Sequence, residues 1–498
     1  MINAILRGKR GAPSVNPRSG ALCYRLNNNG ISVACLLALC VLTGEQVLAA
    51  VTGKVLSNDY AVVVDGRNVE VVMVPTPENR VAANERHPYS YASFESEVEA
   101  EVSVSSSVLS MGIARVLPET KVVGAVTTDG DFVSFRMRPP QTLVVEPRGR
   151  HRALVISANR RCEPVTKGVK TKYYGPGYHR AGRIALGDGE TLYLDRGAWV
   201  EGFVEGHGND LMICGQGVLS GACWDWHKGP KSSDGVNLSG RLVTLSGERI
   251  RVKDVTLFSS WGWCLVFNAV TNALVENVKI LGGRVINDDG IDICRAKDVI
   301  IRNSFIRSQD DCITPKYWCE NLVVTNCTLW TDAANAFRAG FECEDGSTGL
   351  LYRDILVKDV DILHLSLHPT RPEDYWVECA ICIQPSHDQL LTDILFEDIR
   401  FYQCEKHDIF LNVKTMPITQ GSPLCRTDKA GILRNLTLRN IRVPPSGGGM
   451  SVFLKAHDEE HPIECVCFEN VSGYGVVRKI GKVGFRVVDD MKQKGLRK

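Results

Sequence analysis

The sequence lacks an apolar run long enough for a membrane-spanning helix, which needs about 20 residues. Its apolar run "ISVACLLALCVLTG" (31–44) covers only 14 residues. Basic residues precede this run, and the small residues Ala49 and Ala50 follow it. That order is typical of a secretory signal. We predict that residues 1–50 are a signal peptide and that the mature protein is secreted or periplasmic, with no stable membrane association. A membrane anchor is the alternative.

The remaining chain lacks a strong charge of either sign. Residues 1–50 hold five basic side chains and one acid, Glu45, so the net charge of +1 for the whole chain leaves −3 for residues 51–498. No basic tract of the kind that binds nucleic acid remains. We therefore expect a monomer without a nucleic-acid partner.

A disulfide framework is also missing. Three of the 18 cysteines lie in residues 1–50, which leaves 15 for the mature chain. An odd number without regular close spacing does not indicate a framework. Most of these cysteines lie within apolar, strand-like stretches, where free cysteine behaves as a small buried hydrophobe.

From residue 250 onward the sequence lacks a helical periodicity. Instead it repeats a short motif in which apolar and other residues alternate and an Asn or Asp follows. The steps between the polar residues are 23, 26, 23, 33, 39, 42 and 30 residues. A period of 23–26 fits one coil of a β-solenoid, and recurrent Asn or Asp fits a stacked turn in the left-handed region. These polar residues are Asp254, Asn277, Asn303, Asn326, Asp359, Asp398, Asn440 and Asn470.

The segment before the repeats has a different pattern. Residues 51–155 alternate apolar and polar residues in short runs separated by turn signals such as Asp65-Gly66. We predict an all-β protein with a β-sandwich at 51–158, a linker at 159–182, a β-helix at 183–480 and a tail at 481–498.

Two carboxylate doublets lie within the first repeats, in "NDDGIDI" (287–293) and "SQDDCI" (308–313). Asp289 lies 14 residues before Asn303, and Asp311 lies 15 residues before Asn326. The doublets therefore occupy nearly the same place in consecutive coils, about 4.8 Å apart along the axis. A backbone bulge at Asp310–Asp311 would let three carboxylates converge. Such a group suits inverting glycoside hydrolysis, in which a protonated acid and an ionised carboxylate flank the scissile bond.

These doublets resemble the NTDG and (G/Q)DDC motifs of family 28 glycoside hydrolases, the polygalacturonase group. The segments "ICGQGVLSGACWDW" and "VTLFSSWGWCLVF" resemble further motifs of that family. The β-sandwich and the entry into the helix are similar to the related dextranase family 49. The resemblance implies a right-handed parallel β-helix and an inverting hydrolase without cofactor or metal, acting on a polysaccharide.

Carried over residue by residue, the resemblance implies Asp310 as the general acid, with Asp289 and Asp311 holding the attacking water. Asn287 matches the motif's Asn, and Lys316 matches the lysine five residues after the second acid. Asp288 replaces the usual Thr and adds a negative charge. The resemblance implies substrate-binding roles for Asn287, Asp288, Lys316, Asn335 and Lys414.

Two departures concern the substrate. Asn335 replaces the histidine of the family's G-H-G, and the R-I-K segment reads "NVK", with Asn412 for arginine and Lys414 retained. Arg338 and Glu342 are candidate sugar contacts, for which a structural ion pair is the alternative. The loss of cations predicts that the sugar at the cleavage point is neutral, or acidic only at a neighbouring subsite bound by Arg338.

Other classes of site remain open. A calcium site would also suit grouped carboxylates, but Lys316 beside them and the missing dense D-x-D-x-D spacing argue against it. A polysaccharide lyase and a non-catalytic glycan-binding β-helix are the alternative functions. Five tryptophans are candidate sugar platforms, with core packing as the alternative: Trp224, Trp226, Trp261, Trp263 and Trp330.

Overall fold

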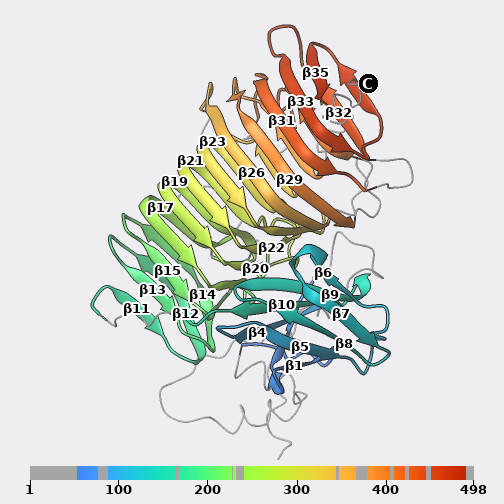
Figure 1. Ribbon diagram of the computed structural model, residues 1–498. Helices are drawn as coiled ribbons and strands as arrows, with labels where there is room; N and C mark the ends of the chain where they lie inside the picture. The colour runs from blue at the N-terminus through green and yellow to red at the C-terminus, as the bar shows by residue number, and fades with distance from the viewer. Residues whose placement is uncertain are drawn as a thin grey trace, which may run out of the picture. The chain divides into compact units, whose positions relative to one another are not determined.

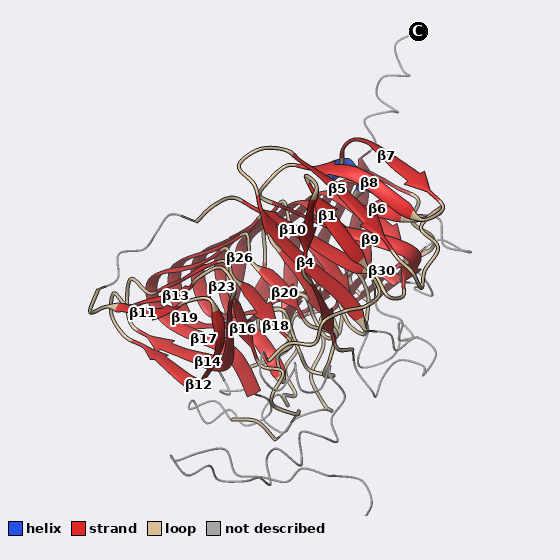
Figure 2. Ribbon diagram, turned by 90° about the horizontal axis from the view of Figure 1, so that it is seen from below, coloured by secondary structure: helices blue, strands red, loops and turns tan. Residues whose placement is uncertain are grey.

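The structure is a computed structural model that describes residues 53–76, 88–162, 168–226, 228–230, 240–343, 347–365, 378–403, 409–420, 426–444 and 450–488. All of them belong to one compact unit, Leu48–Lys498. Strands make up nearly all the regular structure drawn in Figure 2. Within the described ranges no helix has the length and apolar character needed to cross a membrane. The predicted signal peptide lies outside these ranges and remains a prediction.

The first ten strands form two five-stranded sheets, in the orders β2-β1-β5-β8-β7 and β3-β4-β10-β9-β6. Their apolar residues alternate as predicted, because Ala100, Val102 and Val104 of β5 face the core between the sheets. This confirms the predicted β-sandwich. The elements are β1 (Ala61–Val64), β2 (Arg67–Val69), β3 (Val71–Val74), β4 (Tyr89–Glu95), β5 (Ala100–Ser105), β6 (Arg115–Leu117), the 3-10 turn η2 (Glu119–Lys121), β7 (Val123–Asp129), β8 (Phe132–Met137), β9 (Gln141–Arg150) and β10 (Leu154–Asn159).

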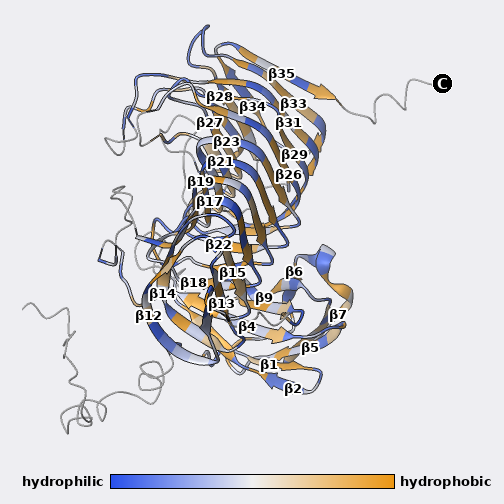
Figure 3. Ribbon diagram, turned by 90° about the vertical axis from the view of Figure 1, so that its left-hand side faces the viewer, coloured by the Kyte–Doolittle hydropathy of each residue, from blue (hydrophilic) through white to orange (hydrophobic). Residues whose placement is uncertain are grey.

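The next 25 strands stack in parallel as the coils of a right-handed β-helix (Figure 1). Hydrophobic and hydrophilic residues alternate along these strands (Figure 3), so one face of each strand fills the interior. The predicted fold class is confirmed. The strands are β11 (Thr171–Tyr174), β12 (Gly177–Leu186), β13 (Thr191–Leu194), β14 (Ala198–His207), β15 (Met212–Gly215), β16 (Val218–Ser220), β17 (Gly240–Lys253), β18 (Thr256–Phe258), β19 (Gly262–Glu276), β20 (Lys279–Leu281), β21 (Ile291–Arg302), β22 (Phe305–Ser308), β23 (Ile313–Thr325), β24 (Thr328–Thr331), β25 (Phe337–Gly340), β26 (Leu351–His364), β27 (Ile381–Gln384), β28 (Leu390–Leu391), β29 (Ile394–Gln403), β30 (Ile409–Lys414), β31 (Ile432–Arg442), β32 (Ser451–Lys455), β33 (Ile463–Ser472), β34 (Val477–Ile480) and β35 (Val483–Val488).

The parallel stack extends beyond the segment 183–480. β11 and the first part of β12 lie within 159–182, which we expected to be a linker, and they pair with β13 and β14. At the other end, β35 lies within the expected tail and pairs with β33. Terminal coils have a neighbour on one side only, so their sequences are less apolar. The apolar repeat is therefore harder to recognise in these coils.

The recurrent polar residues form a ladder, as the repeat predicts. All eight have positive φ, from 49° at Asn326 to 66° at Asp254. Their side chains bond along the stack: Asn277 Nδ2 donates to Asp254 Oδ1 at 2.7 Å, and Asn326 Nδ2 donates to Asn303 Oδ1 at 2.8 Å. Asn and Asp are needed here because they tolerate the left-handed region and can bond to the next coil.

The sandwich packs against the face of the helix formed by β16, β18, β20, β22 and β24. One buried apolar cluster joins Tyr89 and Leu117 of the sandwich to Phe305 and Trp330 of the helix. Figure 1 shows β9 and β10 next to β20 and β22. The turns that leave this face of the helix carry both carboxylate doublets.

Candidate active site

Asp289, Asp311 and Asn335 stack in three successive turns. Each lies two residues before Ile291, Ile313 or Phe337, which pair with one another in register. Backbone bonds join the turns, because Gly290 N donates to Asp311 O at 2.8 Å and Cys312 N donates to Asn335 O at 2.9 Å. The expectation that the doublets occupy equivalent places in consecutive coils is confirmed.

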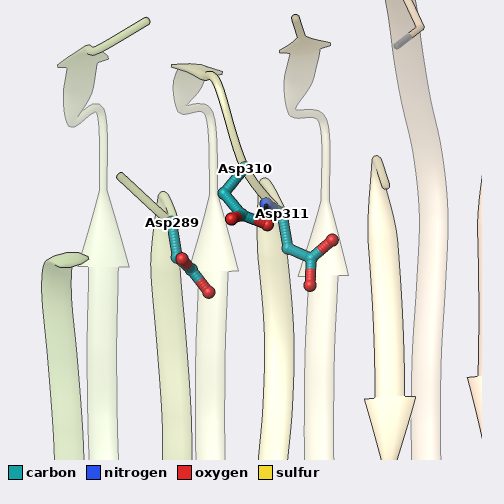
Figure 4. A group of neighbouring side chains, drawn as sticks. All are labelled: Asp289, Asp310 and Asp311. Atoms are coloured by element: carbon teal, nitrogen blue, oxygen red, sulfur yellow. Dashed lines mark hydrogen bonds between the residues drawn. The ribbon is translucent and has the colours of Figure 1, made fainter. Parts of the chain in front are cut away.

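The three aspartates converge because their backbone bends. Residues 309–312 lie in a bend between β22 and β23, so the convergence needs no bulge within a strand. Carboxylate oxygens of Asp289, Asp310 and Asp311 lie within 4.8 Å of one another. Figure 4 shows that the three side chains extend from neighbouring turns. Asp289 and Asp311 are buried, whereas Asp310 is half-buried and is the acid most open to a ligand.

Lys316 lies buried behind Asp289 and binds three acids. Its Nζ is 3.1 Å from Asp289 Oδ2, 2.9 Å from Asp292 Oδ1 and 2.8 Å from Glu342 Oε2. The ammonium also lies 3.7 Å from the centre of the Trp263 ring. Lys316 and Glu342, both expected to bind sugar, therefore form a structural ion pair that fixes Asp289.

Asp292 is one of the three acids that bind Lys316, and we did not predict it from the sequence. It follows Asp289 by three residues and alternates with Ile291 and Ile293, whose side chains fill the interior. The alternation alone places Asp292 on the outer face of the coil. This alternation is the feature of the sequence from which the outward position of Asp292 could have been predicted.

Burial is the main influence on the pKa values of this group. It raises the pKa of Asp289 to about 6; Lys316 opposes the rise, and Asp311 and Glu342 add to it. Burial also holds the pKa of Asp292 well above its ordinary value, against the effect of Lys316. Burial opposes ionisation of Glu342 too, but Lys316 outweighs it and lowers the pKa of Glu342.

Asn335 holds Asp311 in place. Its backbone N and its Nδ2 both donate to Asp311 Oδ1, at 3.0 and 2.7 Å, and its Oδ1 accepts from Cys379 N at 2.8 Å. Arg338 Nη1 lies 3.6 Å from Asp311 Oδ2, and Arg338 Nη2 donates to Gln384 Oε1 at 2.8 Å. Asn287 holds Asp289 in a similar way, because its Nδ2 donates to Asp289 Oδ1 at 3.3 Å.

Asp288, an expected substrate contact, directs both carboxylate oxygens to backbone donors rather than to the other acids. Its Oδ2 accepts from Gly283 N at 2.7 Å and Arg284 N at 3.2 Å, and its Oδ1 accepts from Gln309 N at 2.6 Å. Burial raises the pKa of Asp288 to about 7, against the effect of these three bonds. Because both oxygens are occupied by backbone donors, Asp288 ties the turn at residues 282–290 to the turn at residues 309–312.

Lys414 lies farther along the stack. It ends β30, which is three stacked strands beyond β23 through β25 and β27. At about 4.8 Å for each coil, this places β30 roughly 14 Å from β23 along the axis. Lys414 is buried, with its Nζ 5.4 Å from the centre of the Phe453 ring. Asn412 lies on the same strand and donates from Nδ2 to Cys382 Sγ at 3.6 Å.

The aromatic and thiol side chains serve mainly as packing groups. Trp261 and Trp330 are fully buried, and Trp224 packs against Trp261 with ring centres 4.4 Å apart. Core packing is therefore the role of these three tryptophans. The cysteines in the described ranges are mostly buried, as expected.

Comparison with known proteins supports the resemblance drawn from the motifs. Residues 201–370 match the family model "Glycosyl hydrolases family 28". The chain is 23% identical over 300 residues to probable exopolygalacturonase A of Aspergillus niger, over 49% of this chain and 65% of that protein. It is 32% identical over 125 residues to exopolygalacturonase of Oenothera organensis, over 24% of this chain and 34% of that protein. The chain thus spans less than two thirds of the length of these relatives.

The fold is also found in a solved structure. Dex49A from Penicillium minioluteum superposes with a TM-score of 0.59 and 13% identity, over 85% of this chain and 90% of that one. The similarity therefore includes the sandwich as well as the β-helix. The predicted resemblance to family 28 is confirmed, and Dex49A has the same fold over the sandwich and the β-helix.

Proposed function

We propose that the protein is a secreted glycoside hydrolase that cleaves a polysaccharide with inversion of the anomeric carbon. The observation that carries the proposal is the convergence of Asp289, Asp310 and Asp311 within 4.8 Å on two stacked turns. The match to a glycosyl hydrolase family over residues 201–370 supports the same activity.

Asp310 is the general acid in this proposal. Its half-buried carboxyl gives its proton to the leaving glycosidic oxygen as the bond to the anomeric carbon breaks. A water molecule held by Asp289 and Asp311 forms the new bond to that carbon and passes its proton to one of these carboxylates. Two acceptor oxygens no more than 4.8 Å apart can both accept from one water at about 2.7 Å.

The spacing of the acids bears on the stereochemistry. Two-carboxylate inverting enzymes usually separate acid and base by about 6.5–9.5 Å, whereas retaining enzymes use about 5–5.5 Å. The oxygens here lie within 4.8 Å. We assign inversion because two carboxylates, Asp289 and Asp311, hold the water in this proposal. The usual spacings describe sites with one acid and one base, so they do not apply directly to a site with three carboxylates. The anomer that forms first distinguishes these mechanisms.

The charge of the substrate is a second part of the proposal. Lys316 is already paired with three acids, and Arg338 binds Asp311 and Gln384. The cations beside the acids thus have anionic or polar partners, which supports a neutral sugar at the cleavage point. The two relatives are named exopolygalacturonases, so polygalacturonate is the competing substrate.

A polysaccharide screen with wild type and Asp310→Asn tests this function. We expect new reducing ends from at least one polysaccharide and a loss of about 10²–10⁴-fold in rate for Asp310→Asn. A product that absorbs as an unsaturated uronate would indicate a lyase instead. Glycan binding without turnover, unchanged by Asp310→Asn, would indicate a binding protein. Efficient turnover of de-esterified polygalacturonate would contradict the proposal that the sugar at the cleavage point is neutral.

N-terminal sequencing of exported protein tests the predicted signal-peptide cleavage near residue 50.

A further inference from the structure

The sandwich contacts the same three turns that carry the candidate site. We name these the site turns: residues 282–290 between β20 and β21, 309–312 between β22 and β23, and 332–336 between β24 and β25. They hold Asp289, then Asp310 and Asp311, then Asn335. Each turn begins at the face of the helix that packs against the sandwich.

Tyr89 of β4 reaches the first site turn. Its side chain is fully buried, and its hydroxyl donates to Gly282 O at 2.9 Å. The next residue, Gly283, donates from its backbone N to Asp288 Oδ2 at 2.7 Å. The Tyr89 ring also lies 3.9 Å from the guanidinium of Arg307, two residues before the second site turn begins. One sandwich side chain therefore contacts the entry to two site turns.

Arg150 of β9 reaches the third site turn. Its Nη1 lies 3.6 Å from Asp332 Oδ1. Asp332 Oδ2 accepts from Arg307 Nε and Nη2, at 3.1 and 3.0 Å, so the acid joins the sandwich to the second turn as well. All three side chains are at least nine-tenths buried.

The site turns are also bonded to one another next to these contacts. Gly282 N donates to Arg307 O at 2.9 Å, and Asp332 N donates to Ser308 O at 3.0 Å. Ala333 N donates to Gln309 O at 2.8 Å, directly before Asp310. A shift at Gly282, Arg307 or Asp332 would therefore move the acids relative to one another.

We propose that Tyr89 and Arg150 are positioning residues, through which the sandwich fixes the spacing of the three aspartates. The inference rests on the proposed hydrolase function and deepens it, because it makes the sandwich part of the active unit. Catalytic groups must be held within about 0.5 Å of their working geometry by the packed groups behind them. Moving Asp332 away from Arg150 and Arg307 would leave buried charges without this partner, which is strongly destabilising, so the contact resists displacement.

The test compares two tyrosines of β4. Tyr89→Phe removes the bond to Gly282 and keeps the ring against Arg307. Tyr91→Phe is the matched control: Tyr91 is also buried and its hydroxyl shares a 3.1 Å hydrogen bond with Thr256 Oγ1, in β18 outside the site turns. We expect Tyr89→Phe to lower kcat about five- to tenfold with KM changed less than about twofold. Tyr91→Phe should keep the wild-type kcat at a similar loss of Tm. Equal kcat values for the two variants would overturn the proposal.

A second pair of variants tests the charged contact. Arg150→Lys keeps a cation near Asp332 and should retain more of kcat than Arg150→Met. If both lose kcat equally while their Tm values differ, Arg150 contributes only to stability.

Hydrogen–deuterium exchange separates this proposal from the proposed function. Amides of 282–290 and 309–312 should exchange faster in Tyr89→Phe than in Tyr91→Phe, whether or not a substrate is found. A wild-type protein without hydrolytic activity would end the proposed function, and unchanged exchange in the site turns would end the positioning role.

Discussion

Removing the charge of Lys316 should move the pH dependence of catalysis upward. In the proposed mechanism Asp289 must be ionised, and its pKa is raised to about 6. We therefore expect kcat/KM of the wild type to fall as the pH drops below about 6. Lys316→Gln removes the cation that opposes the effect of burial, so more alkaline conditions are needed to ionise Asp289.

The size of the shift follows from the geometry. Two unit charges 3.1 Å apart interact by roughly 5 kcal/mol at an effective dielectric constant of about 20. This figure is an upper limit for the effect on Asp289, because water and side chains rearrange once the ammonium is removed. One pKa unit corresponds to about 1.4 kcal/mol. The acidic limb should therefore rise by up to about 4 units.

Asp292→Asn is the matched variant, with the opposite expected sign. It keeps the shape of the side chain but removes a carboxylate that disfavours ionisation of Asp289, so the acidic limb should move to lower pH. The assay is kcat/KM against pH for the three proteins, with folding checked at each pH by circular dichroism. Shifts of the two variants in the same direction, or no shift in either, would refute the assigned role of Lys316.

Three further outcomes are expected. Asn335→Ala should lower kcat about tenfold or more, because Asp311 loses the side-chain donor, and Asn335→Asp should lower it further through repulsion; steady-state kinetics of both variants measures this. Asp288→Ala should reduce the free energy of unfolding by roughly 3 kcal/mol, because three backbone donors, two of them buried, lose their acceptor; urea unfolding that shows no loss would contradict the role given to Asp288. Asn303→Ala should cost about 1–2 kcal/mol in the same assay, because Ala at positive φ is strained and the ladder bond to Asn326 is lost.

The sequence predicts those features that depend on local pattern and repetition. The ladder from Asp254 to Asn470 has one conformational requirement at every coil, so its spacing reveals both the solenoid and the register of Asp289 with Asp311. The same register lets all three acids meet only if the backbone departs from a regular strand at Asp310–Asp311, and the structure has a bend there.

The environment of the acids could not be predicted in the same way. Whether Asp288 or Asp289 faces the other acids depends on how residues 282–290 turn, and neighbours in a bend do not follow strand alternation. The three partners of Lys316 come from strand β21, from the turn before it and from the loop after β25. The bond from Tyr89 to Gly282 joins residues 193 positions apart, and no local pattern encodes such a contact.

Proton NMR of the first product formed from a cleaved polysaccharide tests the proposed inverting mechanism. We predict that wild-type protein releases the anomer opposite to that of the scissile bond, before mutarotation, and that Asp310→Asn releases almost none. Net retention, an unsaturated product, or undiminished release by Asp310→Asn would contradict it.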